Sequence, residues 1–290
     1  MILSTMTSVL AKRFGTKEAI KIISDAKFDA YDFTICGLGE DSPVFGDDYL
    51  NYAKDLRNFA DERGIICNQA HAPFPSSYGE KEKDEKVFLK IVRSMEVAAI
   101  LGAKIIVVHP KQHLTYAEHQ EELFEMNVEF YKSLIPYCEK FGIKVACENM
   151  WQNNSASGAI TDSTCSRAWE FCKYIDAVNS EWIVGCLDIG HVSLVTKNIP
   201  DFIRAMGNKR LKALHVHDTD FKNDLHNLPF TQKIDYLSVV RALGEIQYEG
   251  DFTYEADCFL KGFPTEFLPE ASAFMCKVGR CLIDNMNRAE

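Results

Sequence analysis

Short apolar runs rich in β-branched residues alternate along the chain with longer amphipathic segments. Each short run has the length of a buried strand, and each longer segment repeats apolar residues three and four positions apart, as one face of a helix does. This alternation is typical of repeated β-α units around a parallel sheet. The eight runs that we predict as strands begin near Ile2 and continue at 30–36, 65–71, 103–109, 143–149, 182–188, 211–217 and 251–257.

Glycines mark the ends of several predicted helices. Gly64, Gly102 and Gly142 each stand just before a predicted strand, where a left-handed residue commonly closes a helix. A last amphipathic segment, 265–289, gives the eighth helix. Eight such units predict an α/β protein of the (β/α)8 TIM-barrel type, with one domain over 1–290. An open doubly wound sheet is the alternative, but no Gly-rich loop follows the first predicted strand.

Composition and charge narrow the classes of function. The net charge of −10 does not provide the basic surface that binds a phosphate backbone, so we do not expect nucleic acid as a partner. None of the ten cysteines forms a Cys-x-x-Cys pair, which is typical of free thiols in a reducing compartment. The sequence shows no signal-peptide pattern and no apolar run near the roughly 18 residues of a membrane span. We therefore expect a cytoplasmic protein without a membrane partner.

Six consecutive predicted strands end in an imidazole or a carboxylate, and two further groups follow the seventh strand. The strands of a TIM barrel all open on one mouth at their carboxyl ends, so these side chains would converge there. Each alone has a plain structural interpretation, as a turn residue, a helix cap or a surface acid. Buried together they would be costly without a partner, and a divalent cation would serve several at once. The residues are His71, His109, Glu148, Asp188, His191, His215, His217, Asp224, His226 and Glu255.

These motifs resemble those of the xylose isomerase-like TIM-barrel superfamily, which holds sugar isomerases and epimerases together with endonuclease IV. They run in order through "HAPF", "VVHP", "CENM", "LDIGH", "HVHDTD", "DLH" and "YEAD". The resemblance implies a metal site formed by Glu148, Asp188, a strand-seven histidine and Glu255. The His-x-x-Asp pattern favours His215 over the neighbouring His217. Three oxygen donors and one imidazole suit Mn²⁺, Mg²⁺ or Co²⁺, with Zn²⁺ as an alternative.

The same resemblance implies a metal-dependent sugar or sugar phosphate isomerase/epimerase of carbohydrate metabolism. Glu148 and Glu255 would exchange a proton with opposite faces of the substrate through an enediolate, assisted by the metal. His191 would hold a substrate hydroxyl, and Phe74 and Trp151 would form apolar walls. The acidic loop "GLGEDSPVFGDDY" favours an unphosphorylated sugar or polyol. Whether the protein is a homodimer stays open.

Endonuclease IV is the alternative from a different class of function. Its trinuclear zinc site resembles the set His71, His109, Glu148, Asp188, His191, His215, Asp224, His226 and Glu255, so a multinuclear zinc site stays open. The negative charge argues against a nuclease for abasic DNA, as does "YEAD" where Glu-Thr-Pro is expected. The segment "NLPFTQKID" also lacks a Gly-rich run and is similar to the bacterial isomerase/epimerase branch. A dehydratase acting on a polyol or inosose is a further alternative. A degenerate sugar-binding module would lack a ligand, and none is missing.

Overall fold

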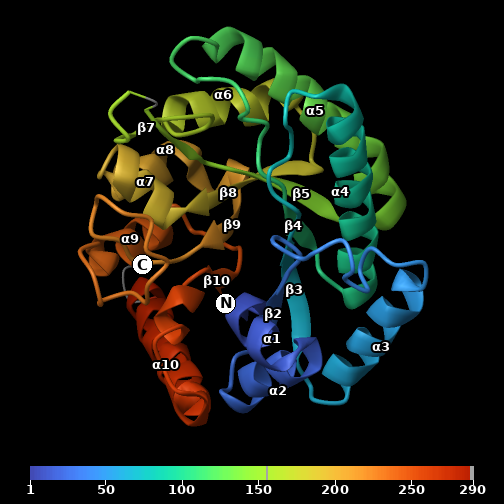
Figure 1. Cartoon of the computed structure of the whole chain (residues 1–290). Helices are drawn as coiled ribbons and strands as arrows, with labels where there is room; N and C mark the ends of the chain where they lie inside the picture. The colour runs from blue at the N-terminus through green and yellow to red at the C-terminus, as the bar shows by residue number, and fades with distance from the viewer. Residues whose placement is uncertain (155, 288–290) are drawn as a thin grey trace.

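Eight parallel strands form a nearly closed barrel in the computed structural model, which describes residues 1–154 and 156–287 (Figure 1). The strand order is β10-β1-β2-β3-β4-β5-β8-β9. Val216, just after β9, closes the ring, because its N–H donates to the Thr253 carbonyl at 2.9 Å and its carbonyl accepts from the Glu255 N–H at 3.2 Å. The predicted TIM barrel is therefore confirmed. The strands are β1 (Leu3–Met6), β2 (Ala30–Thr34), β3 (Ile66–His71), β4 (Ile105–Val107), β5 (Lys144–Glu148), β8 (Ile183–Asp188), β9 (Leu211–His215) and β10 (Phe252–Tyr254).

Helices surround the barrel, and the first and last strands of the chain, β1 and β10, pair with each other (Figure 1). Their apolar faces cover the strands, as in α2, which buries Ala19, Ile20, Ile22 and Ile23. None of the described helices is both long and apolar enough to cross a bilayer. The helices are α1 (Ser8–Phe14), α2 (Thr16–Asp25), α3 (Tyr49–Asp61), α4 (Lys81–Leu101), α5 (Gln120–Phe141), α6 (Ala168–Val178), α7 (Ile189–Val195), α8 (Ile199–Arg210), α9 (Tyr236–Glu245) and α10 (Leu268–Asn287), with short 3-10 turns η1 (Asp257–Leu260) and η2 (Thr265–Phe267).

Alternate residues of each strand face two different cores. The outward positions pack beneath the helices in one large apolar cluster, which includes Cys147, Leu187 and Leu214. The inward positions Ala146, Cys186 and Ala213 belong to a small separate cluster that fills the barrel lumen. Because side chains repeat every second residue along a strand, the next inward positions on these three strands lie at the mouth. Those positions are Glu148, Asp188 and His215.

The glycine signals mark helix ends as predicted at two of three positions. Gly102 and Gly142 cap α4 and α5 in the left-handed conformation. Gly64 is also left-handed, but it lies two residues beyond the cap of α3 at Glu62. The last helix reaches Asn287, and the remainder of its predicted range lies outside the described residues.

After β1, the barrel strands are shorter than predicted, most of all β4 and β10, and one hairpin was not predicted. Strand β9 ends at His215 instead of residue 217, and β10 ends at Tyr254 instead of residue 257. After β5 the chain forms an antiparallel hairpin of β6 (Trp151–Asn153) and β7 (Ile160–Asp162). Strands of three residues carry too little periodicity to be recognised in a sequence. The hairpin matters for function because it brings Trp151 to the mouth.

Candidate metal centre and active site

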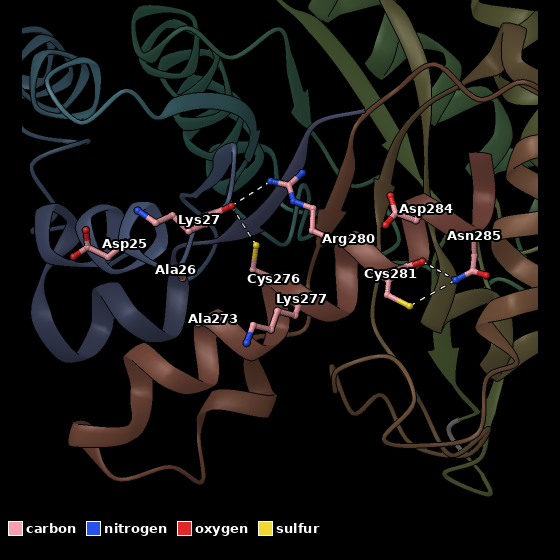
Figure 2. Close-up of a pocket in the computed structure, with 10 residues that line it drawn as sticks. All are labelled: Asp25, Ala26, Lys27, Ala273, Cys276, Lys277, Arg280, Cys281, Asp284 and Asn285. Atoms are coloured by element: carbon pink, nitrogen blue, oxygen red, sulfur yellow. Dashed lines mark hydrogen bonds between the residues drawn. The ribbon is translucent and has the colours of Figure 1, made fainter. Parts of the chain in front are cut away.

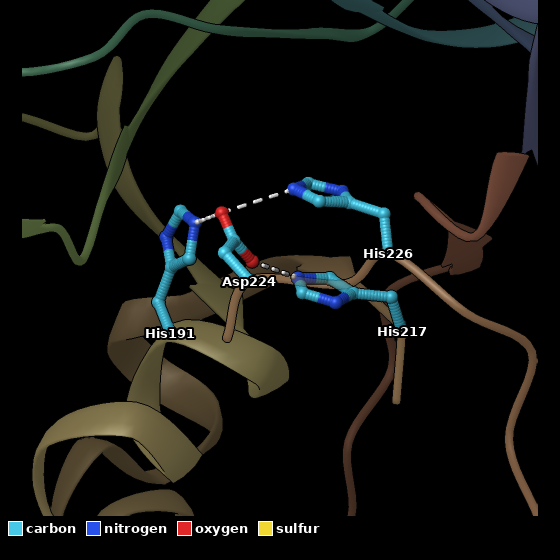
Figure 3. A group of neighbouring side chains, drawn as sticks. All are labelled: His191, His217, Asp224 and His226. Carbon is cyan, nitrogen blue, oxygen red and sulfur yellow. Dashed lines mark hydrogen bonds and ion pairs between the residues drawn. The ribbon is translucent and has the colours of Figure 1, made fainter. Parts of the chain in front are cut away.

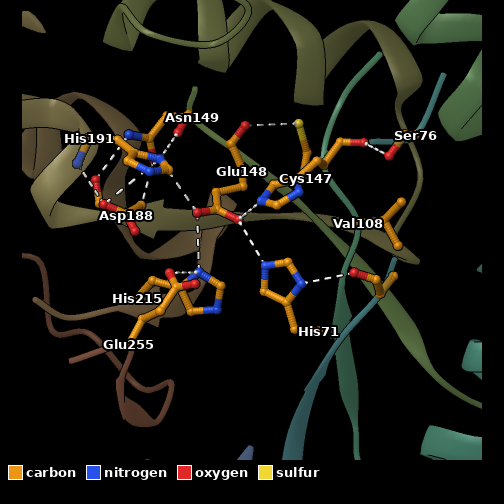
Figure 4. A network of polar contacts seen from close by, with 12 residues as sticks. His71, Ser76, Val108, Cys147, Glu148, Asn149, Asp188, His191, His215 and Glu255 are labelled. Carbon is orange, nitrogen blue, oxygen red and sulfur yellow. Dashed lines mark hydrogen bonds and ion pairs between the residues drawn. The ribbon is translucent and has the colours of Figure 1, made fainter. Parts of the chain in front are cut away.

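Four side chains from neighbouring strands converge at the carboxyl end of the barrel (Figure 4). Glu148, Asp188, His215 and Glu255 each offer one ligand atom, and these atoms all lie within 4.8 Å of one another. His215 is central, because its Nδ1 lies 3.1 Å from Glu148 Oε1 and 3.0 Å from Glu255 Oε2. We call these four residues the inner cluster. Three carboxylates and one imidazole so close together form a donor set for a divalent cation.

The electrostatics of the inner cluster keep both glutamates ionised. Burial would raise the pKa of Glu148, but His215 and His109 beside it hold that pKa well below its usual range. Burial is likewise outweighed at Glu255, whose pKa is lowered by His215 and His226. The pKa of His215 is raised well above its usual range despite its burial, by Cys186 and by the two glutamates. An ionised carboxylate is the form that ligates a metal or accepts a proton.

His71 and His109 approach Glu148 from β3 and β4 and form a second group of possible ligands with it. His109 Nε2 lies 2.9 Å from Glu148 Oε2, and His71 Nε2 lies 3.8 Å from the same oxygen. His71 donates its Nδ1–H to the Ala72 carbonyl at 2.9 Å, and burial lowers the pKa of the ring to about 4. Its Nε2 therefore presents a lone pair toward a carboxylate oxygen that is buried without a well-formed hydrogen bond. A cation between them would remove this repulsion.

A second cluster lies toward the rim of the mouth and comprises His191, His217, Asp224 and His226 (Figure 3). We call it the outer cluster. Asp224 Oδ2 lies 3.1 Å from His226 Nε2 and 3.5 Å from His191 Nε2. Both of these histidines donate their Nδ1–H to a backbone carbonyl, His191 to Asn149 at 2.8 Å and His226 to Glu255 at 3.0 Å. Such carbonyls hold histidines with Nε2 directed at a metal or an acid.

Two histidines of the outer cluster have raised pKa values, as His215 does in the inner cluster. Although burial opposes it, Asp188 and Asp224 raise the pKa of His191 to about 10. Burial is also outweighed at His226, where Asp224 and Glu255 raise the pKa to about 11. The pKa of Asp224 is lowered in turn by His191 and His226, against the effect of burial. Without a cation the outer cluster balances its charge with protons on the imidazoles.

In the segment "LDIGH", Asp188 and Gly190 each have a structural role. Asp188 caps α7 by accepting from the His191 N–H at 2.6 Å, so the cap predicted as its plain structural interpretation exists alongside its place in the inner cluster. Gly190 leaves room for the ring of His217, since a Cβ at this position would lie 1.9 Å from His217 Cε1. His217 therefore reaches Asp188 with its Nε2, at 3.0 and 3.1 Å from the two carboxylate oxygens. Asp188 thus touches both clusters.

The two histidines at the end of β9, His215 and His217, face the same side but contact different partners. His215 meets Glu148 and Glu255, whereas His217 meets Asp188 and stacks on His226 at 4.1 Å. This division supports His215 as the inner ligand. The next residue, Asp218, turns away from the site and accepts the backbone N–H groups of 232–234 at 2.8–3.1 Å. It fixes the "NLPFTQKID" segment beside the mouth.

The aromatic side chains expected as walls border the mouth. Phe74 is 42% exposed and packs edge-on against His109, with ring centroids 4.7 Å apart. Trp151, on β6, donates its Nε1–H to Asp224 Oδ2 at 3.3 Å and lies edge-on to His191. Phe74 therefore contacts a histidine beside the inner cluster, and Trp151 contacts the outer cluster.

Sequence reasoning missed one ionisable group of the site, Asp32 on β2. It is buried in the lumen below the mouth, where the Gln69 amide donates to its Oδ2 at 2.9 Å. The same oxygen lies 3.9 Å from His215 Nε2. Burial raises the pKa of Asp32 to about 6. The run "AYDFTIC" could have indicated this group, because burying an acid in the middle of an apolar strand is costly unless the acid has a partner.

The family model of the xylose isomerase-like TIM barrel matches residues 20–277. The chain belongs to this family. A protein of Methanocaldococcus jannaschii, described as uncharacterised, is 26% identical over 80% of this chain and 76% of its own length. A Haemophilus influenzae protein with a provisional L-ribulose-5-phosphate 3-epimerase name is 26% identical over 66% of this chain and 64% of its own. The crystal structure of a D-tagatose 3-epimerase-like protein superimposes with a TM-score of 0.75 at 19% identity, covering 99% of both chains.

A separate groove of this xylose isomerase-like barrel lies between the end of α2 and helix α10 (Figure 2). Arg280 crosses it to Asp29 and to the Lys27 carbonyl, and Cys276 contacts the same carbonyl. Asp29 also accepts from the Leu3 N–H where β1 begins. The groove therefore lies at the amino ends of the strands, where conserved features of a TIM barrel serve stability and not catalysis.

Proposed function

We propose that this xylose isomerase-like barrel is a sugar isomerase/epimerase that works with one divalent cation held by the inner cluster. The observation that carries the proposal is the convergence of Glu148, Asp188, His215 and Glu255, with all four ligand atoms within 4.8 Å. The donor set fits a cation, because Glu148 Oε2 is buried without a hydrogen bond although two histidines face it. The epimerase names of a relative and of a solved structure with this fold support the reaction class.

The chemistry follows from two ionised glutamates that meet at one point. A bound cation would polarise a substrate carbonyl and so acidify the neighbouring C–H. Glu148 and Glu255 reach His215 Nδ1 from different strands at 3.1 and 3.0 Å. One ionised carboxylate would remove the proton beside the carbonyl, and the other, having first taken up a proton, would give that proton to the enediolate from the opposite face. The neighbouring histidines lower the pKa values of both groups, so each is available in its ionised form to accept a proton.

The rim of the mouth would bind the rest of the substrate. The His191 and His226 Nε2 atoms, with Asp224, form a polar wall suited to sugar hydroxyls. Phe74 and Trp151 provide apolar surface for a sugar face. In the described part of the chain, the ion pairs of the mouth join histidines to acids and include no Lys or Arg. This supports an unphosphorylated sugar or polyol, in contrast to the phosphorylated substrate named for the Haemophilus relative.

The first experiment is to measure the metal content of the protein purified without added metal or chelator. About one Mn, Mg, Co or Zn per chain supports the mononuclear site. The metal-loaded protein is then incubated in D₂O with a panel of ketopentoses and ketohexoses, free and phosphorylated. Epimerisation through an enediolate places one solvent deuterium on the inverted carbon of the product. A metal-loaded protein that neither converts nor deuterates any sugar of the panel contradicts the proposed reaction.

A second candidate function has one specific observation in its favour. Four groups of possible ligands overlap or adjoin one another. Glu148 belongs to two of them, and Asp188 contacts the outer cluster through His217. A carboxylate has two oxygens and can bridge two cations, so two or three zinc ions would fit here. That content would support hydrolytic chemistry like that of endonuclease IV, which cleavage of abasic DNA would test. Appearance of a dehydrated ketone in the sugar panel would instead identify a polyol or inosose dehydratase.

A further inference from the structure

The barrel lumen contains a carboxylate directly beneath the histidine of the proposed metal site. Asp32 lies on β2, buried, and faces the side of the His215 ring that is opposite to the glutamates. The Gln69 amide fixes Asp32 Oδ2 at 2.9 Å. Two atoms there are buried without a hydrogen bond, namely His215 Nε2 and Asp32 Oδ1. Polar atoms left unpaired in a protein interior are rare and call for an explanation.

The tautomer of His215 provides the explanation. Nδ1 now faces Glu148 and Glu255 at 3.1 and 3.0 Å, so it carries a proton. A metal that takes Nδ1 as its ligand displaces that proton, and the neutral ring must then carry its hydrogen on Nε2. The acceptor closest to Nε2 among its ion-pair contacts is Asp32 Oδ2 at 3.9 Å. This is about 1 Å beyond a normal hydrogen bond, a gap that a small rotation of either side chain closes.

We propose that Asp32 is a positioning residue that accepts the Nε2–H of His215 and so fixes this ring for metal binding. The role rests on the proposed metal site, and it adds a residue that no strand-end motif contains. Metal-bound histidines commonly donate their second N–H to a carboxylate, which orients the ring and strengthens it as a donor. Gln69, on the adjacent strand and in register with Asp32, orients the carboxylate in turn.

The proposal is tested by the affinity for Co²⁺ and Zn²⁺, measured by competition with a chromophoric chelator on the full-length protein. Asp32→Asn keeps the shape of the side chain and removes its charge, and we expect the affinity to fall by about 10- to 100-fold. The unfolding midpoint of the metal-free variant should stay equal or rise, because a buried charge is lost. In the wild-type zinc form, the His215 Nε2–H should give a downfield NMR signal that the variant lacks.

Two controls separate positioning from general damage to the lumen. Asp251→Asn makes the same change in another partly buried acid, which accepts from Asn68 at 2.9 Å, and should leave the metal affinity unchanged. Asn68→Ala removes the amide that donates to this acid, and should likewise leave the metal affinity unchanged. If Asp32→Asn does not fold, Gln69→Met frees the carboxylate instead and should weaken metal binding in the same direction by a smaller factor.

The outcomes distinguish this role from the metal site itself. Wild-type protein that binds neither cation overturns the proposed metal site, and the role of Asp32 with it. Wild-type binding with an Asp32→Asn affinity within twofold overturns the role of Asp32 alone. An equal loss of metal affinity in the Asp251 variant would show a general structural effect on the lumen, and would also overturn the role proposed for Asp32.

Discussion

Glu148 and Glu170 are both buried glutamates, yet their surroundings drive their pKa values in opposite directions. Glu148 lies at the mouth among histidines, and its pKa is held well below its usual range against the effect of burial. Glu170 lies in the first turn of α6, where it accepts from the Cys165 N–H at 3.0 Å. Burial dominates there and raises the pKa to about 7, against the hydrogen bond from Tyr116. Burial alone raises the pKa of a carboxylate, whereas burial beside several imidazoles lowers it.

The comparison also gives the reason for proposing a cation at the mouth and none at the Glu170 site. A lone buried acid can become neutral by taking up a proton. The acids of the mouth, Glu148, Asp188 and Glu255, stand too close together and too near imidazole nitrogens to do so independently. Their charge is balanced by protons on histidines or by a metal, and only the second leaves the glutamates free to act as bases.

The largest effect should follow from neutralising either mouth glutamate. Glu148→Gln or Glu255→Gln should lower turnover by at least about 10³-fold, because each variant loses a metal ligand and an acid/base group together. The variants should remain folded, since the change preserves side-chain volume. Turnover and the circular dichroism spectrum check this, with Glu170→Gln as the control for altering a buried glutamate elsewhere. Substantial activity in either mouth variant would rule out the two-carboxylate mechanism.

A smaller effect is expected in the outer cluster. Asp224→Asn should reduce kcat/KM by about 10- to 100-fold, because the amide no longer charges or orients His191 and His226. If the inner cluster holds the only metal, metal content per chain should stay at the wild-type value. A drop from two or three metal ions to a smaller number would show that the outer cluster is itself a metal site, which elemental analysis of both proteins decides.

His71 and His109 test how far the inner site extends. With one metal, His71→Ala and His109→Ala should be milder than Glu148→Ala and should retain the cation, because neither belongs to the inner cluster and both approach Glu148 on its Oε2 side. We expect a loss of turnover of about tenfold from the changed environment of this carboxylate. Metal content and turnover are measured on the three variants together. Equal loss of metal from all three would indicate a multinuclear site.

The barrel and the polar groups at its mouth could be predicted from the sequence, whereas several contacts inside the barrel could not. Eight β-α units and strand-end motifs such as "LDIGH" are local signals, so the barrel and the convergence of ten polar groups at its mouth could be predicted. Asp32 was missed because its importance depends on what stands opposite it across the lumen, on β9. The same holds for the clearance that Gly190 gives His217. Contacts across a barrel are set by closure and register, which no single segment encodes.

At Glu170, away from the mouth, we expect an effect on the dependence of stability on pH. Because its pKa is raised to about 7 from an ordinary value of 4.5, the folded protein favours the neutral carboxyl. Its stability is then full below pH 4.5, falls as the pH rises toward 7, and stays lower above it, by up to about 3 kcal/mol. Glu170→Gln removes this loss and can keep the hydrogen bond from Cys165. Denaturant unfolding should give matching midpoints at pH 4.5 and a more stable variant at pH 8. A difference independent of pH would show that packing, and not the buried charge, decides stability there, and would remove the contrast with Glu148.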